Sequence, residues 1–128
     1  MPYIHLQVNQ ELSEGTLREI SLQLLEITAG VLRKKPEVTE IVIEHTSRSW
    51  HWSLAGQRQT SVMYKLDISI TEGTNTDEEK ACWISAAHRL MSDCLLQSEL
   101  VNYITINEIP AGSWGYNGVT QHTRMSSK

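Results

Sequence analysis

The residue best suited to chemistry lies at the start of the chain, in Met1-Pro2-Tyr3-Ile4. Removal of Met1 would make Pro2 the chain terminus and leave a secondary amine on a rigid ring. Burial and neighbouring cations both disfavour the charged form of such an amine and lower its pKa. A neutral amine in a dry pocket is a general base. A proline is also tolerated as the first residue of an edge strand without any chemical role, so this alternative stays open.

Other reactive side chains form weaker patterns. Cys82 and Cys94 lack the CxxC spacing and the paired histidines of a zinc site, and the five histidines form no HxxxH pair. We therefore expect no metal site. The one basic cluster, Arg33-Lys34-Lys35, is also explained as a solvated helix end whose charge complements the helix dipole.

The elements that must position these residues occur twice. In the first copy, residues 4–8 alternate between apolar and polar, as in a strand covered on one face. Apolar residues then recur every three or four positions from 17 to 31, which predicts a helix with Ser13 as N-cap and an end shortly before Pro36. The β-branched residues 41–43 predict a second strand.

The second copy keeps an offset of 62 or 63 residues. Residues 66–70 alternate as the first strand does, the capping box 76–79 opens a second helix, and residues 104–106 correspond to the second strand. The segment 52–56, which begins with Trp and ends with Gly, recurs at 114–118. An offset held across four elements indicates an internal repeat.

Two tandem βαβ units therefore predict one domain over residues 1–128, with pseudo-repeats at about 2–56 and 64–118 and a C-terminal tail at 119–128. Right-handed crossovers place each helix on the same side of its strands. The predicted fold is α+β, a four-stranded sheet with two helices on one face. The other face carries mixed polar and aromatic residues, so it is either solvated, as in a ferredoxin-like binding module, or lines the middle of an oligomer. The polar tail is either disordered or wraps a neighbouring subunit.

Composition excludes several classes of protein. The 128 residues include 15 acidic and 11 basic side chains, which gives a formal charge of −4. This charge repels polyphosphates, so no nucleic-acid partner is expected. No apolar run approaches the ~20 residues that cross a bilayer, and the first residues lack the pattern of a secretory signal. The sequence predicts a soluble cytoplasmic protein with no membrane partner.

The whole arrangement resembles the tautomerase superfamily, which includes 4-oxalocrotonate tautomerase and macrophage migration inhibitory factor. The resemblance runs from Met1 to about Gly118. Residues 104–118 are similar to the second strand and closing hairpin of the short 4-oxalocrotonate tautomerases, and residues 72–80 resemble their strand-to-helix loop. The resemblance to the superfamily implies a fused two-repeat subunit with a fold like that of macrophage migration inhibitory factor. It also implies a homotrimer in which the mixed sheet face is turned inward.

The resemblance also implies roles for single residues. Pro2 would be the catalytic base, and Tyr103, reached from a neighbouring subunit, would polarise a carbonyl oxygen. Lys35, in a lysine-proline step, would bind the substrate carboxylate. Trp52 and Trp114 lie in the two predicted hairpins, where they would form a hydrophobic wall that excludes water. Tyr103 is explained equally well as an ordinary strand aromatic. A solvated helix end also explains Lys35, and packing alone explains either tryptophan.

Arginines depart from the superfamily patterns. Residues 72–77 contain none, whereas the dehalogenase and decarboxylase branches carry arginines in this loop. Residues 9–11 replace the arginine that follows the first strand in 4-oxalocrotonate tautomerase. Arg48 and Arg58 flank the first hairpin, and Arg48 is the candidate to bind a carboxylate in their place.

The predicted function is keto–enol proton transfer on a small 2-oxo acid or 2-hydroxydienoate, catalysed by a tautomerase that needs no metal or organic cofactor. One alternative is hydration by the same base, as in a dehalogenase or decarboxylase of the superfamily. The missing loop arginines argue against it. The other alternative is a non-catalytic trimeric interaction protein with this fold, which retention of Met1 would favour.

Overall fold

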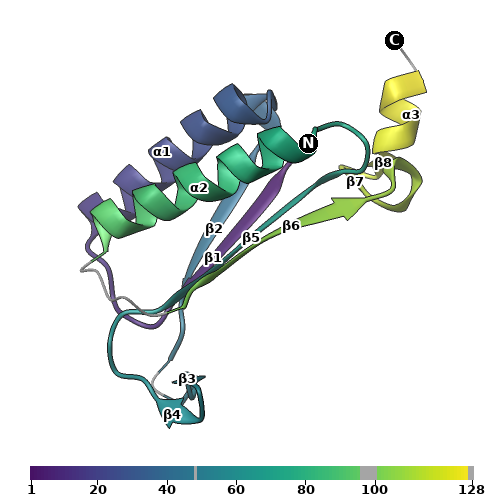
Figure 1. Ribbon diagram of the computed structural model, residues 1–128. Coiled ribbons are helices and arrows are strands. Elements are labelled where there is room, and N and C mark those ends of the chain that lie inside the picture. Colours follow the sequence, from purple (N-terminus) through teal and green to yellow (C-terminus); the bar gives the residue numbers. More distant parts are fainter. Residues whose placement is uncertain (48, 96–100, 127–128) are drawn as a thin grey trace.

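A four-stranded sheet covered on one face by two helices makes up the body of the protein. The computed structural model describes residues 1–47, 49–95 and 101–126 (Figure 1). Along the chain, the main elements are β1 (Tyr3–Val8), α1 (Glu14–Val31), β2 (Glu40–His45), β5 (Tyr64–Thr71), α2 (Asp77–Cys94) and β6 (Tyr103–Ile109). The helices α1 and α2 pack side by side on the same face of the sheet (Figure 1).

The sheet order is β2-β1-β5-β6. Each βαβ unit contributes one parallel pair, β1 with β2 and β5 with β6, and the two units join through the antiparallel pair β1 and β5. The predicted α+β fold, with two tandem βαβ units and both helices on one face, is thus confirmed. Since β1 and β5 run in opposite directions, the two units lie antiparallel to each other in the sheet.

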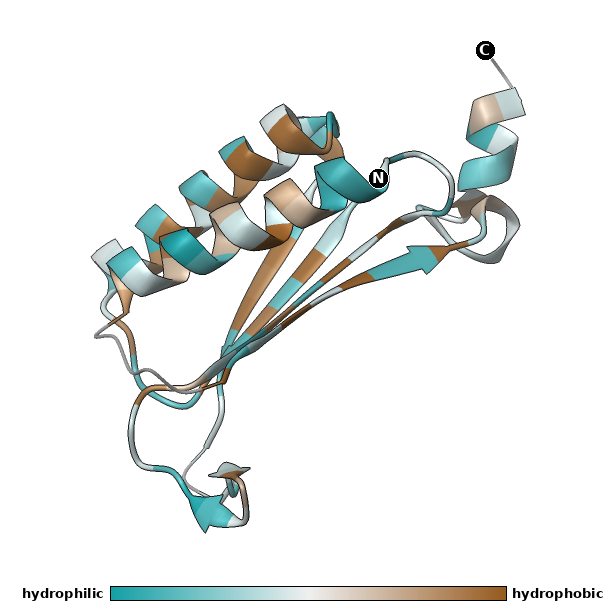
Figure 2. Ribbon diagram, viewed as in Figure 1, coloured by the Kyte–Doolittle hydropathy of each residue, from teal (hydrophilic) through white to brown (hydrophobic). Residues whose placement is uncertain are grey.

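The core lies between the sheet and the two helices. All six inward side chains of the central strands from Ile4 to Val8 and from Leu66 to Ile70 are fully buried. Ile20 and Leu24 of α1 and Trp83 of α2 close the core from above, and Figure 2 shows brown, hydrophobic bands along the helices and strands that enclose it. The predicted stripe of α1 is therefore confirmed. Ile84, next to Trp83 on α2, is 37% exposed, because Trp83 takes the inward position.

Both helices begin where the sequence indicates. The Ser13 side chain accepts a hydrogen bond from the Thr16 backbone amide and caps α1. At α2 both halves of the capping box are present, between Thr76 and Glu79. These bonds satisfy amides that the first turn of a helix leaves without a partner.

Two short hairpins extend from opposite ends of the sheet (Figure 1). The first consists of β3 (Ser53–Leu54) and β4 (Gln57–Arg58), and the second of β7 (Gly115–Tyr116) and β8 (Val119–Thr120). Each turns through two residues with positive φ, Ala55-Gly56 in the first and Asn117-Gly118 in the second. Such pairs form the two-residue turns that match the twist of antiparallel strands.

The remaining elements are short helices: η1 (Pro36–Val38), η2 (Ala111–Ser113) and α3 (Gln121–Ser126). Helix α3 occupies most of the segment predicted as a tail, and it packs on η2 and β8 of its own chain. Within the described part of the chain, no helix has both the length and the apolar character needed to cross a bilayer.

The sheet face opposite the helices is mixed, as predicted. His5 Nε2 lies 2.9 Å from Glu44 Oε1, and the Lys65 ammonium forms an ion pair with Asp67. Tyr103, on the edge strand β6, is 68% exposed. This face therefore carries polar pairs and an aromatic side chain that no other described part of the chain covers.

Candidate functional site

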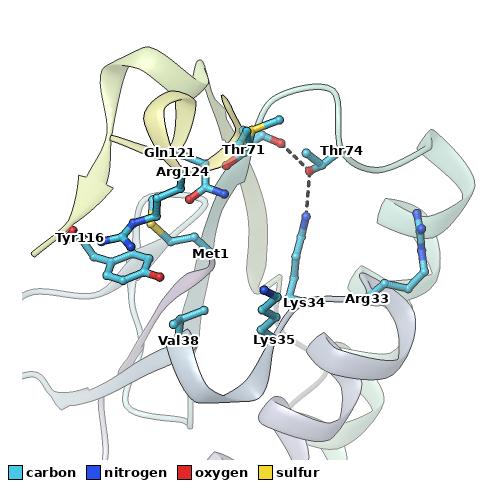
Figure 3. A pocket seen from close by; sticks show the side chains of 11 residues that line it. Met1, Arg33, Lys34, Lys35, Val38, Thr71, Thr74, Tyr116, Gln121 and Arg124 are labelled. Atoms are coloured by element: carbon cyan, nitrogen blue, oxygen red, sulfur yellow. Dashed lines mark hydrogen bonds between the residues drawn. The ribbon is translucent and has the colours of Figure 1, made fainter. Parts of the chain in front are cut away.

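A cavity of about 220 Å³ opens at the end of the sheet where β1 begins and β5 ends (Figure 3). It is smaller than the roughly 300–1,000 Å³ typical of sites for drug-sized ligands. Its wall includes Met1, the basic cluster 33–35, Thr71 and Thr74 of the β5–α2 connection, and Tyr116, Gln121 and Arg124 from the second hairpin and α3. With Met1 in place, the cavity therefore has room only for a molecule of a few carbon atoms, and loss of the Met1 side chain from its wall would enlarge it.

The strand pairing brings the chain start to this cavity. Tyr3 lies opposite Ser69 in the antiparallel pair, so the residue before β1 meets the carboxyl end of β5. Pro2 is buried there, and its carbonyl oxygen accepts a hydrogen bond from the Glu40 amide at 3.4 Å. Met1, which is bonded to the Pro2 nitrogen, lines the cavity.

The basic cluster bends over the same edge because the chain turns sharply after α1. Arg33 adopts a left-handed conformation, with φ of 58°, and its guanidinium points away to Glu79, at 2.8 and 3.1 Å. Lys34 and Lys35 follow on the cavity side (Figure 3). The Lys34 ammonium donates a hydrogen bond of 2.8 Å to the Thr74 hydroxyl, which in turn donates to the Thr71 carbonyl oxygen.

The amino group of Met1 is half-buried beside these lysines, and its pKa falls from 8.0 to about 6. Burial is the main cause, because it penalises the charged form, and repulsion from Lys34 and then Lys35 adds to it. Burial, followed by the Arg33 guanidinium, also lowers the pKa of Lys34. Burial and the two lysines therefore favour the neutral form of the Met1 amine.

The far wall comes from α3, which lies in the segment that the sequence predicts as a polar tail. Arg124 Nη2 donates to the Tyr116 carbonyl oxygen at 2.9 Å, and the guanidinium carbon lies 3.7 Å from the centre of the Tyr116 ring. Thr120 caps this short helix through a hydrogen bond from the Thr123 amide to its hydroxyl. This Thr-x-x-Thr pattern is the signal that could have predicted α3, and hence Arg124, from the sequence.

The cavity is positively charged, although the protein carries a net charge of −4. Among the residues that the structure describes, no carboxylate forms an ion pair with Lys34, Lys35 or Arg124. Low-dielectric walls around charges of one sign raise the local concentration of oppositely charged ligands. The arrangement therefore favours a small anion next to a neutral amine.

Comparison with known proteins addresses the fold. No protein-family model and no curated protein matches the chain. Solved structures are similar over nearly the whole length of the chain. A fused 4-OT described as a wild-type asymmetric trimer has a TM-score of 0.85 at 16% identity, covering 95% of this chain and 98% of that one. Pt0534 inactivated by 2-oxo-3-pentynoate has a TM-score of 0.84 at 15% identity, with the same coverage.

A macrophage migration inhibitory factor-like protein from Entamoeba histolytica has a TM-score of 0.76 at 15% identity, covering 93% of this chain and 97% of that one. The chain has the tautomerase superfamily fold. The resemblance that the sequence indicates is thus confirmed at the level of fold, including the fused arrangement of two repeats.

Within this tautomerase fold, three of the predicted site residues meet at one end of the sheet. Pro2 is buried next to Met1 in the chain, and Met1 and Lys35 line the cavity. Trp114 donates a hydrogen bond of 3.2 Å from its indole nitrogen to the hydroxyl of Thr71, which lines the same cavity. The structure thus places these three residues at one end of the sheet, and their roles stay predictions.

Two others lie at the opposite end of the same chain. Tyr103 is paired with Lys65 at the start of β6, a whole strand length from Thr71. Trp52 donates to the Thr46 hydroxyl at 3.0 Å and lines a separate, open cavity of about 670 Å³ with Trp50 and Arg58. Arg48 lies outside the described residues. Tyr103 and Trp52 can therefore reach a Pro2 cavity only across an interface with another copy.

Replacement of the lysines should change the ionisation of the terminal amine in a defined order. We expect Lys34→Gln to raise the pKa of the Met1 amino group toward 8.0, and Lys35→Gln to raise it less, because Lys34 contributes the larger repulsion. The pH dependence of reductive methylation, read by mass on the N-terminal peptide of protein that retains Met1, measures this pKa.

Lys65→Gln provides the control, since Lys65 lies at the other end of the strand and is paired with Asp67. It should leave the pKa of the amino group unchanged. An equal effect of all three substitutions, or none, would show that charge at the cavity does not control this amine.

Proposed function

We propose that the protein is a tautomerase that moves a proton between oxygen and carbon of a small 2-oxo acid, with Pro2 as general base after removal of Met1. The observation that carries this proposal is the cavity itself, where an amine at the chain start has a lowered pKa among cations that no described carboxylate neutralises. A neutral amine accepts a proton, and the cations attract an anionic substrate.

The proposed reaction is a net isomerisation. The neutral Pro2 nitrogen removes the proton of an enol hydroxyl, and the electrons of the broken O–H bond form the carbonyl. The carbon–carbon double bond then takes the same proton from the Pro2 ammonium at the conjugated carbon. Oxygen loses one bond to hydrogen, carbon gains one, and Pro2 returns to its neutral form, so no oxidant, reductant or metal enters the balance.

The lysines would oppose the charge that develops during this transfer. An enolate intermediate places negative charge on oxygen, which Lys34 and Lys35 at the cavity wall stabilise. The same lysines keep the pKa of the terminal amine low and so keep the base active at neutral pH. Trp114, beside Thr71, would limit the access of water.

The proposal includes a homotrimer, because Tyr103 and Trp52 lie at the far end of the sheet in the same chain. The open sheet face and the exposed Tyr103 offer a surface for a second copy, and the similar fused 4-OT structures are described as trimers. An assembly of three such chains would allow Tyr103 of one copy to polarise a carbonyl oxygen at Pro2 of the next.

Light scattering tests the assembly. We expect a mass near three times 14.5 kDa. A monomer whose mass does not change with concentration would contradict the trimer and leave Tyr103 without access to Pro2.

Phenylenolpyruvate provides the test of catalysis. Protein shown by intact mass to begin at Pro2 should accelerate its ketonisation, and Pro2→Ala should lower kcat/KM by roughly 10²-fold or more, the usual contribution of a general base. The alkyne 2-oxo-3-pentynoate, with which the similar Pt0534 was inactivated, should add to the Pro2 nitrogen of this protein and shift the mass of its N-terminal peptide. An unchanged rate in Pro2→Ala would contradict the role of Pro2.

A further inference from the structure

The strongest feature that the proposed reaction leaves unused is the guanidinium of Arg124 on α3. Resting on that proposed function, we propose that Arg124 binds the substrate carboxylate, with the Gln121 amide beside it. The arginine that anchors the anion would then come from the C-terminal helix and not from the first hairpin, where Arg48 was expected.

Arg124 is held in place by one partner and keeps most of its donors. Its Nη2 bonds the Tyr116 carbonyl oxygen, and its flat face stacks on the Tyr116 ring. The Nε of Arg124 is buried and has no hydrogen-bond partner within the described residues. A guanidinium has five N–H donors, so several remain for a ligand. Stacking on an aromatic ring fixes the plane in which those donors lie.

The same wall holds an unused acceptor. Oε1 of Gln121 is also buried without a hydrogen-bond partner within the described residues. Gln121 and Arg124 are three residues apart on α3, so their side chains leave the same side of the helix. Buried polar atoms usually have partners, and a free donor beside a free acceptor indicates a missing group that both accepts and donates. A carboxylate next to an enol hydroxyl has both properties.

The other cations at the cavity are less suited to this role. Arg33 already donates from Nε and Nη2 to the Glu79 carboxylate. Lys34 donates to Thr74, and its position beside the terminal amine makes it more useful for controlling that amine. Lys35 offers a single flexible ammonium, whereas carboxylate geometry matches the planar fork of an arginine.

The position of Met1 connects Arg124 to the base. In Figure 3 the side chain of Met1 lies between Arg124 and Tyr116 on one side and Lys35 on the other. Removal of Met1, which the proposed function requires, clears the space between the Pro2 nitrogen and Arg124. A substrate held there by its carboxylate would present its reacting atoms to Pro2.

Substrates with and without charge distinguish binding from a structural role. We expect Arg124→Gln to lower kcat/KM for phenylenolpyruvate by at least 10-fold, yet to change kcat/KM for its methyl ester less than about threefold, because the ester has no carboxylate for Arg124 to bind. Arg124→Lys should recover only part of the loss. Arg89→Gln removes an exposed arginine from α2 and should change neither rate.

A second measurement does not depend on catalysis. Proton–nitrogen NMR titration with 3-phenylpropanoate and 3-phenylpropanamide should show that Arg124→Gln weakens binding of the acid and not of the amide. If wild type binds the acid through Arg124 but lacks activity, the proposed function fails and the binding site stands.

Equal losses for acid and ester, or unchanged binding of the acid by the Arg124 variants, would overturn the proposal. In that case the guanidinium only supports the hairpin, with Gln121 as its partner. The amide spectrum of each variant verifies its fold, and Arg124→Lys, which keeps the charge over Tyr116, replaces Arg124→Gln if the latter fails to fold.

Discussion

The electrostatic cost of charging an amine at the start of β1 is the constraint on which the site depends. Burial removes water from that amine, and two lysines from the turn after α1 face it. Both effects require the antiparallel pairing of β1 with β5, because that pairing carries the first residues to the edge where the β5–α2 connection and the basic turn meet. The core that fixes β1 and β5 therefore also fixes the ionisation of the amine.

The two copies of the internal repeat differ at the position where the proposed base lies. Tyr64 occupies the position that corresponds to Pro2 in the second copy, at the other end of the sheet. Its side chain is buried, its hydroxyl lies 2.7 Å from Nδ1 of His88, and burial raises its pKa to about 12. A buried neutral phenol in mid-chain offers no amine, so each chain holds one proposed base although its fold is nearly symmetric.

Local patterns in the sequence were sufficient to predict the repeat and most of the fold. Alternation in β1 and β5, the cap at Ser13 and the capping box at Thr76 are short-range signals, and all four appear in the structure. Contacts that depend on the packing of distant segments were harder to predict. The six-residue helix α3 is stabilised by its packing on η2 and β8, and such a short helix has little stability of its own.

The orientation of the basic cluster 33–35 was equally difficult to predict from the sequence. The sequence of three consecutive cations does not reveal which side chains face the cavity. In the structure, the left-handed conformation of Arg33 directs its side chain to Glu79, and Lys34 and Lys35 remain at the cavity. Arg124 was missed because it lies in a segment without a hydrophobic period, and the separation of Tyr103 from Pro2 follows from strand direction and not from spacing.

The most direct measurement is a nitrogen-15 NMR titration of Pro2 in protein whose intact mass shows that Met1 is absent. We expect the Pro2 nitrogen to lose its proton below pH 7, and the transition to move upward when Lys34 is replaced by Gln. A nitrogen that is still protonated at pH 7, as a solvated chain terminus is, would contradict the role of burial and of the lysines.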